Sequence, residues 1–167
     1  AIERLNVLMQ FVGLQNSPTE IECFSANRTV SRKGHSIIMD FGASSAKMYI
    51  SNEGALNRMH RINVGGTQIT QQFADLQETD FESAELKKIQ LTKDDAEYES
   101  LKGIYTKIYS RPLREFKQVI EHYRSTNEID IDVIHICGGS SLHAGLPHMV
   151  QEATGIPTEY INPFTNV

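Results

Sequence analysis

The sequence contains no apolar run close to the roughly 20 residues that a membrane-spanning helix requires, which argues against direct membrane insertion. It also lacks an excess of basic residues, because 16 lysines and arginines stand against 21 acids and the formal net charge is -5. Binding to phosphate backbones needs a basic surface, so this balance argues against nucleic acid as a general partner. Neither an internal repeat nor a low-complexity segment is visible.

Residues with strong site chemistry are few. The two cysteines, Cys23 and Cys137, lie far apart in apolar surroundings and are predicted to be buried free thiols rather than a disulfide. The six histidines show no metal-ligand spacing with a cysteine or an acid, so we interpret them as structural or surface residues. They are His35, His60, His122, His135, His143 and His148. Ser140 and Ser141 follow glycines without a Gly-x-Ser-x-Gly pattern, so a serine hydrolase is unsupported.

The chain has 167 residues, of which 40% are hydrophobic and 22% charged. This composition is typical of a soluble globular domain with its own core. The apolar spacing predicts a helix over 1–13 that ends at Gly13, and then an antiparallel start of three strands over 36–63. Later elements are expected as helices from 65, over 82–92, over 94–125 and over 142–153, and as strands over 131–137 and 158–161. Pro112 should kink or split the long helix. The sequence therefore predicts an α/β fold with a mixed sheet of about five strands flanked by helices.

The hairpin around Asp40 is the first candidate site. A strand ends at Asp40, and the turn that follows contains only small residues: Gly42, Ala43, Ser44 and Ser45. The unshielded N–H groups of such a turn form a concavity that binds phosphate. Asp40 is placed to hold Mg²⁺ through water rather than to contact the phosphate. A plain β-turn is the alternative interpretation.

Two glycine pairs follow strands and are expected to precede helices. Gly65-Gly66-Thr67 would let an anion approach a helix N-terminus, although a tight strand-to-helix turn also favours glycine. Gly138-Gly139-Ser140 would admit a flat base or a sugar close to the backbone.

Glu85 and Lys88 form a third candidate. They lie three residues apart on one predicted helix, so they share a face. A carboxylate there can accept from ribose hydroxyls, and an ammonium group can approach the base or the phosphates. An ordinary exposed ion pair is the alternative interpretation.

The order of these motifs is more specific than any one of them. The sequence resembles the nucleotide-binding half of the actin, Hsp70 and sugar-kinase superfamily, which implies an actin-like (ribonuclease H-like) lobe. Within that group it is similar to the PilM family of type IV pilus assembly, with FtsA the next most similar. Asn162-Pro163-Phe164 resembles a closing signature of the PilM family.

The resemblance implies ATP and Mg²⁺ as ligands. By resemblance, Asp40 with Gly42, Ala43, Ser44 and Ser45 would be a phosphate loop, and Gly65, Gly66 and Thr67 would lie beside the phosphates. Glu85 and Lys88 would contact ribose and adenine, and Gly138, Gly139 and Ser140 would bracket the adenosine. Ala46 departs from the family, which usually carries threonine there, so one hydroxyl contact to phosphate is missing.

The family clamps its nucleotide between two lobes, each with an Asp-x-Gly hairpin, but this sequence has one such hairpin. We therefore expect residues 1–13 to be a helix remaining from a preceding lobe and 14–167 to be the second lobe. With half of the cleft missing, nucleotide binding should be weak or absent and turnover should not be measurable. Whether the parent protein is an enzyme stays open.

The resemblance also implies a cytoplasmic protein that is peripheral to the inner membrane through partners, with PilN as the expected partner. The PilN tail is expected to dock mainly on the other lobe, and homo-oligomer formation is left open. Two alternative functions remain: half of a true ATPase or sugar-kinase-like phosphotransferase, and an interaction-only lobe that has lost nucleotide binding.

Overall fold

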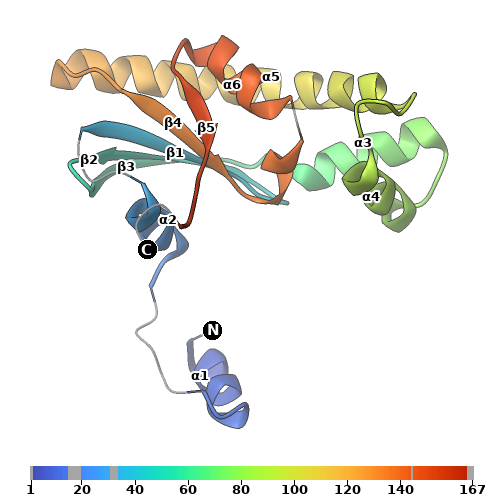
Figure 1. Ribbon diagram of the computed structural model, residues 1–167, viewed down its shortest axis with the longest axis horizontal. Helices are drawn as coiled ribbons and strands as arrows, with labels where there is room; N and C mark the ends of the chain where they lie inside the picture. Colours follow the sequence, from blue (N-terminus) through green and yellow to red (C-terminus); the bar gives the residue numbers. More distant parts are fainter. Residues whose placement is uncertain (1, 15–19, 31–33, 144, 165–167) are drawn as a thin grey trace.

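A computed structural model describes residues 2–14, 20–30, 34–143 and 145–164 of the chain. One five-stranded sheet lies at the centre of these residues, with the strand order β3-β2-β1-β4-β5 (Figure 1). The strands are β1 (His35–Phe41), β2 (Ala46–Asn52), β3 (Ala55–Ile62), β4 (Val133–Cys137) and β5 (Thr158–Tyr160). The α-helices are α1 (Ile2–Phe11), α2 (Glu22–Thr29), α3 (Gly66–Gln77), α4 (Phe81–Gln90), α5 (Tyr98–Asn127) and α6 (Leu146–Thr154), and η1 (Gly139–Leu142) is a 3₁₀ helix.

The sheet is mixed, as the sequence predicts. β1, β2 and β3 are joined by hairpins and pair antiparallel, whereas β4 pairs parallel with β1 and with β5. Parallel neighbours need a crossover, and α3 to α5 supply it before β4 while α6 supplies it before β5. The β2–β3 turn carries Glu53 and Gly54 at φ 49° and 80°, the backbone that two-residue hairpin turns favour.

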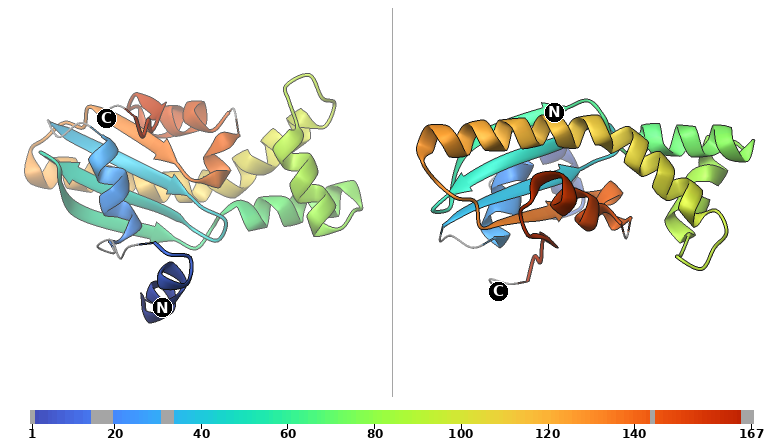
Figure 2. Two further views of the ribbon diagram at one scale, coloured as in Figure 1. Left: turned by 60° about the horizontal axis from the view of Figure 1, so that its bottom comes forward. Right: turned by 90° about the horizontal axis from the view of Figure 1, so that it is seen from above.

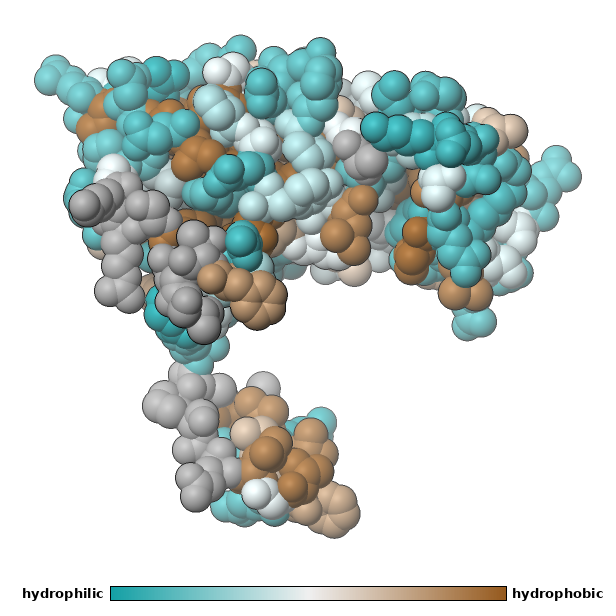
Figure 3. All heavy atoms as spheres, viewed as in Figure 1, coloured by the Kyte–Doolittle hydropathy of each residue, from teal (hydrophilic) through white to brown (hydrophobic). Residues whose placement is uncertain are grey.

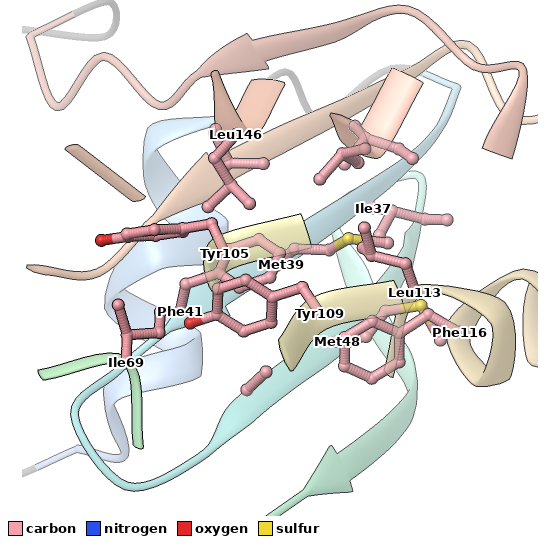
Figure 4. Close-up of a cluster of buried hydrophobic side chains, with 14 of the residues drawn as sticks. Ile37, Met39, Phe41, Met48, Ile69, Tyr105, Tyr109, Leu113, Phe116 and Leu146 are labelled. Atoms are coloured by element: carbon pink, nitrogen blue, oxygen red, sulfur yellow. The ribbon is translucent and has the colours of Figure 1, made fainter. Parts of the chain in front are cut away.

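The main core fills the space between the sheet and the long helix α5 (Figure 4). β1 sends every second side chain, such as Met39 and Phe41, to this face, and both are fully buried. α5 contributes aromatic residues at helical spacing, and its Tyr109 ring meets Phe41 edge-on at 5.1 Å. Packing against α5 thus holds β1 and β4 in place. The candidate site residues lie at the C-terminal ends of these two strands.

The opposite face of the sheet carries a smaller cluster under α2. Cys23 and Val30 pack there against Ile38 and Tyr49. Both cysteines are free, as predicted, but only Cys23 is buried and Cys137 is partly exposed.

α5 corrects one expectation. The helix runs unbroken for 30 residues with Pro112 inside it, so the alternative of a split was wrong. Proline removes one backbone hydrogen bond, and Figure 2 shows that the helix bends along its length. Leu113 and Phe116 are buried beyond Pro112, as Tyr109 is before it, so packing on the sheet holds both halves together.

The segment after Gly139 corrects a second expectation. The sequence predicted an α-helix from 142, but η1 comes first and α6 begins only at Leu146. Pro147 lies in the first turn of α6, a position that proline tolerates because its missing N–H has no helical partner there. Gly155 adopts φ 75° and ends α6, as predicted.

α1 stands away from the body of the protein (Figure 1). It forms where predicted and contains no buried residue, and Gly13 follows it at φ 70°. Its apolar side chains gather in a brown patch in Figure 3, and Phe11 is 87% exposed.

Candidate functional site

The β1–β2 turn leaves three backbone donors unused. Gly42 N–H donates to the Ser45 carbonyl at 3.0 Å and closes the turn. Within the described ranges, the N–H groups of Ala43, Ser44 and Ser45 make no hydrogen bond. Ala43 and Ser44 are exposed and small, so they leave their own N–H groups uncovered, whereas Ser45 is only 5% exposed. Such a run of free N–H groups fits an anionic oxygen. Ala46 follows without a hydroxyl group.

Asp40 is the last residue but one of β1 and lies near this turn. It pairs in register with Lys47 on β2 and with Cys137 on β4. Lys47 Nζ lies 3.7 Å from Asp40 Oδ2 and also contacts Glu22 on α2. Burial raises the pKa of the Asp40 carboxyl, since the charged form loses solvent. Burial, together with the Asp40 charge, also raises the pKa of Cys137 to about 12, so that thiol is neutral.

The start of α3 packs directly on the turn. Gly66 N–H donates to the Gly42 carbonyl at 3.0 Å, and Thr67 N–H donates to the Ala43 carbonyl at 2.8 Å. A Cβ atom on Gly65 would lie only 2.5 Å from the Ala43 carbonyl oxygen. These helix N–H groups therefore serve the protein itself, and close packing accounts for both glycines. The donors left for an anion are those of the turn.

The second glycine pair meets the same turn from β4. Gly138 adopts φ 90°, and a Cβ there would overlap the Asp40 carboxylate. Ser140 Oγ donates to the Gly42 carbonyl at 3.2 Å, and it occupies the space that a Cβ on Gly66 would need. A Cβ on Gly139 would meet nothing within 4 Å, so the backbone there borders open space. The ends of β1 and β4 and the start of α3 lie together in Figure 1.

Glu85 and Lys88 form more than a surface pair. Lys88 Nζ donates to Glu85 Oε2 at 2.6 Å and to Thr70 Oγ1 at 2.7 Å, and Thr70 also hydrogen-bonds with Glu85. The Lys88 side chain is only 9% exposed. Partial burial raises the pKa of Glu85, but the hydrogen bonds from Lys88 and Thr70 outweigh it and lower the pKa overall. Thr70 Oγ1 also lies 3.0 Å from the Gly66 carbonyl oxygen, which connects this pair to the glycine turn.

A cavity of about 160 Å³ lies between the end of α4 with the segment that follows it, α5 and η1. Lys88 and Gly139 line it, and a stack of aromatic rings forms one wall. His143 stacks on Tyr105 at a centroid distance of 4.0 Å and on Tyr98 at 5.6 Å. The lining residues are Lys88, Ile89, Leu91, Thr92, Lys93, Tyr98, Tyr105, Gly139, Leu142 and His143.

The predicted site residues therefore converge, although sequence reasoning missed several neighbours. Lys47 gave no signal beyond its position opposite Asp40 across the hairpin. Thr70 was hidden on the buried face of a helix, where a threonine is easily taken for core. His143 was interpreted as structural or surface and instead lines the cavity with Tyr105.

No cluster of three or more histidines, cysteines or acids that could hold a metal ion occurs in the described part of the chain. Asp40 is a carboxylate of the candidate site that could bind Mg²⁺ through water and together with phosphate oxygens. None of the described helices has the length and apolar character needed to cross a bilayer.

With this geometry in place, solved structures identify the fold. One chain of the "PilM-PilN type IV pilus biogenesis complex" superposes with a TM-score of 0.78 at 17% identity, covering 98% of this chain and 48% of the other. MreB5 of Spiroplasma citri bound to ADP superposes with a TM-score of 0.70 at 14% identity, covering 98% and 61%. Ta0583, an archaeal actin homolog, gives a TM-score of 0.65 at 13% identity, covering 86% and 49%. The protein therefore has an actin-like fold.

The family follows from the sequence itself. Residues 18–167 match the family described as type IV pilus assembly protein PilM. The chain belongs to this PilM family. A comparison with curated proteins found no significant match. The chain spans about half the length of most of the solved structures named above.

Proposed function

We propose that this chain is the ATP-binding lobe of a two-lobed, actin-like pilus assembly protein. The observation that carries the proposal is the convergence of the three free N–H groups of the β1–β2 turn with Gly139 and the cavity beside Lys88. A nucleoside triphosphate needs an anion cradle at one end and a flat, partly apolar slot at the other. The turn would supply the cradle and the cavity would supply the slot, and the hydrogen bond from Ser140, the neighbour of Gly139, to the Gly42 carbonyl supports their proximity.

Each residue then has a defined part. Ala43, Ser44 and Ser45 would donate their N–H groups to phosphate oxygens, and Asp40 would orient the water shell of Mg²⁺. Gly139 would let the sugar pass close to the backbone, and Lys88 would present its ammonium at the edge of the cavity. Glu85 is 37% exposed at its side chain and would accept from a ribose hydroxyl. Gly65, Gly66 and Thr67 would lie beside the phosphates but would support the turn rather than donate to the ligand.

Affinity should be low for this lobe alone. Phosphoryl transfer depends on charge stabilisation from all sides of the transferring group, and the described residues form one wall. Residues 1–13 would belong to the junction with another lobe, which agrees with the exposure of α1. We propose that ATP binding joins two lobes in the complete protein and that turnover is absent here.

The partner follows from the solved neighbour, which was determined as a complex with PilN. A PilN-like protein is the proposed partner of the complete protein, with the PilN tail docking mainly on the other lobe. This would place the protein in the cytoplasm, held at the inner membrane through that partner.

An interaction-only lobe is the competing function, and two observations favour it. Ala46 provides no hydroxyl to phosphate, and the N–H groups of Gly66 and Thr67 are already used. A lobe of this kind would present surfaces to partners and bind no nucleotide.

Two measurements test the proposal. Thermal unfolding of this chain with millimolar Mg-ATP should show a small shift, because a ligand stabilises by about 2.7 kcal/mol only at 100 times its dissociation constant. A shift of many degrees would contradict the incomplete cleft. Phosphate release should be undetectable, and steady turnover would favour the alternative of an ATPase or phosphotransferase half.

A further inference from the structure

β3 is the outermost strand on one side of the sheet. It begins the strand order β3-β2-β1-β4-β5, so within the described part of the chain only its inner side pairs with a strand (Figure 2). The strand is 8 residues long, and most of these residues are exposed. The free side of such an edge is a template on which another strand can pair.

The β1–β2 hairpin fixes which residues of β2 face β3. Hydrogen-bonded pairs alternate with non-bonded pairs along antiparallel strands. Gly42 N–H donates to the Ser45 carbonyl at one end of this hairpin, and Glu53 N–H donates to the Gly34 carbonyl at the other. Both ends give the same alternation, in which the N–H and C=O groups of Met48 turn away from β1 and toward β3.

The same alternation leaves backbone groups of β3 free. Met48 is in register with His60, so this pair is a bonded one, and the neighbouring residues Met59 and Arg61 direct their N–H and C=O groups outward. Met59 is 63% exposed, and Arg61 is exposed as well. A partner strand can therefore pair with β3 without breaking a bond of the sheet.

The edge is basic, although the chain carries a net charge of -5. β3 contains Arg58 and Arg61 and no acid, and among the described residues neither arginine forms an ion pair or a side-chain hydrogen bond. Arg61 lies opposite Lys47 in the register, and like charges in this position are unfavourable. Lys47 is compensated by Asp40 and Glu22, whereas Arg61 is not. The outer edge therefore has two positive charges that an acidic partner would balance.

These charges also decide between two occupants of the edge. A second copy of β3 would bring its own arginines next to Arg58 and Arg61, so pairing between copies is repelled. A strand with acidic side chains would gain ion pairs in addition to the main-chain hydrogen bonds.

We propose that β3 accepts an extended acidic segment of a partner protein as a further strand of the sheet. The proposal does not depend on nucleotide binding. The register dictates the pattern of the segment: an acid opposite Arg61, an apolar residue opposite Met59 and an acid opposite Arg58. In this mode of recognition the main-chain hydrogen bonds give affinity and the side chains give specificity.

The test uses a synthetic peptide, acetylated and amidated, with the sequence Thr-Thr-Glu-Thr-Val-Glu-Thr-Thr. It is titrated into the isotope-labelled chain, and the backbone amides are followed by NMR. The largest shift changes should occur at Met59 and Arg61, and these two amides should become protected against hydrogen exchange. The His60 amide should be protected already in the free protein, because it faces β2.

Two altered peptides separate the contributions. A peptide with lysine in place of both glutamates should bind about tenfold more weakly, because two attractions become repulsions. A peptide with N-methylvaline in place of valine should bind about fivefold more weakly, because it lacks the N–H that pairs with β3.

Two pairs of variants test the protein side. Met59→Pro removes an outward N–H but no bond to β2, so the chain should stay folded and lose the peptide. Its matched control, Met59→Val, keeps the N–H and should bind like the wild type. Arg61→Glu should weaken the acidic peptide about tenfold and strengthen the lysine peptide. Lys107→Glu reverses a charge beside α3, away from the edge, and should change neither affinity by more than about twofold.

Equal affinity for the acidic and the lysine peptide overturns the proposal, and so does full affinity for the N-methylated peptide. Shift changes confined to residues outside β3, or none at millimolar peptide, overturn it as well. Concentration-dependent protection of the Met59 amide without peptide would show that a second copy occupies the edge, contrary to the proposal. If Met59→Pro fails to fold, the N-methylated peptide answers the same question on the wild type.

Discussion

The Ser140 hydroxyl donates to the Gly42 carbonyl at 3.2 Å, although 98 residues separate them in the sequence. The same carbonyl accepts from Gly66 N–H, so one oxygen joins the hairpin, the first glycine turn and the second. This shared contact is the structural basis for treating three separate motifs as one site.

The contact can be tested by a double-mutant cycle. Ser140→Ala should destabilise the protein by about 1 kcal/mol through the lost hydrogen bond. Gly66→Ala places a methyl group where Ser140 Oγ lies, so it should break the same bond in the wild type. In the Ser140→Ala background, Gly66→Ala should instead be neutral or stabilising by up to about 1 kcal/mol, because alanine favours a helix. Urea unfolding gives the coupling free energy, and strictly additive effects would contradict the geometry.

Replacement by alanine should affect stability very differently at the neighbouring glycines Gly138 and Gly139. Gly138→Ala should cost about 1–3 kcal/mol of stability, because the residue adopts φ 90° and its Cβ would overlap Asp40. Gly139→Ala should leave the melting temperature almost unchanged, because its Cβ meets open space. Thermal unfolding of the two variants makes the comparison, and equal losses would contradict the difference in backbone and space between the two positions.

Gly139→Val extends the same comparison to binding. A branched side chain at the edge of the cavity should block the sugar and base, so ATP affinity should fall while folding is retained. Melting temperature and NMR affinity measured on the same samples separate the two effects. Normal ATP binding by the Gly139→Val variant would remove Gly139 from the site.

Asp40 is predicted to lower stability while serving the site. Its folded pKa is raised, so the folded state becomes less favourable as pH rises from the ordinary aspartate value through the raised pKa. Asp40→Asn should therefore be more stable than the wild type at pH 7, and the difference should vanish in acid. In the Asp40→Asn variant, the affinity for Mg²⁺ in the presence of ATP should fall by about 10- to 100-fold, as it does when an outer-shell partner of a metal is lost. Chemical unfolding and titrations with and without Mg²⁺ measure the two effects, and an unaltered Mg²⁺ dependence would exclude Asp40.

His143 should make the protein sensitive to acid. Its folded pKa of about 4 lies below the unfolded value of 6.5, so between these values the unfolded state binds more protons. Stability should fall by up to roughly 3 kcal/mol as pH drops through this window. His143→Leu should flatten the dependence in urea unfolding between neutral and mildly acidic pH. Part of the slope should remain, because burial also lowers the pKa of His135. An identical slope in both proteins would contradict a neutral, buried imidazole.

Much of this fold is predictable because its signals are local. The two short apolar runs, Ile37–Met39 in β1 and Met48–Ile50 in β2, and the small turn at Gly42 between them indicate a hairpin without knowledge of the rest. The break before α6 was missed, since a 3₁₀ turn and an α-helix share apolar spacing over a few residues. Pro112 was misjudged as a potential break because packing of Tyr109 and Phe116 on the sheet cannot be seen in a propensity argument.

The candidate site, like the fold, was predictable from the sequence only in part. Glycine pairs and an Asp-x-Gly hairpin are visible as motifs, whereas their contact through Gly42 and Ser140 depends on strand order. Thr67 was predicted to lie beside the phosphates, but its N–H donates to the Ala43 carbonyl, a contact that the motif alone does not reveal. His143 could not be recognised from its neighbours in sequence, since Tyr98 and Tyr105 reach it from another element.

The most direct test of the account is an NMR titration of this chain with Mg-ATP, with every backbone amide observed. The account predicts that the largest shift changes occur at Ala43, Ser44, Ser45 and Gly139, and that they saturate together in the millimolar range. Adenosine alone should move Gly139 and the cavity residues but leave the turn unchanged. Changes scattered over unrelated surfaces, or none at millimolar ATP, would contradict the claim that the turn and the glycine pairs form one wall of a nucleotide site.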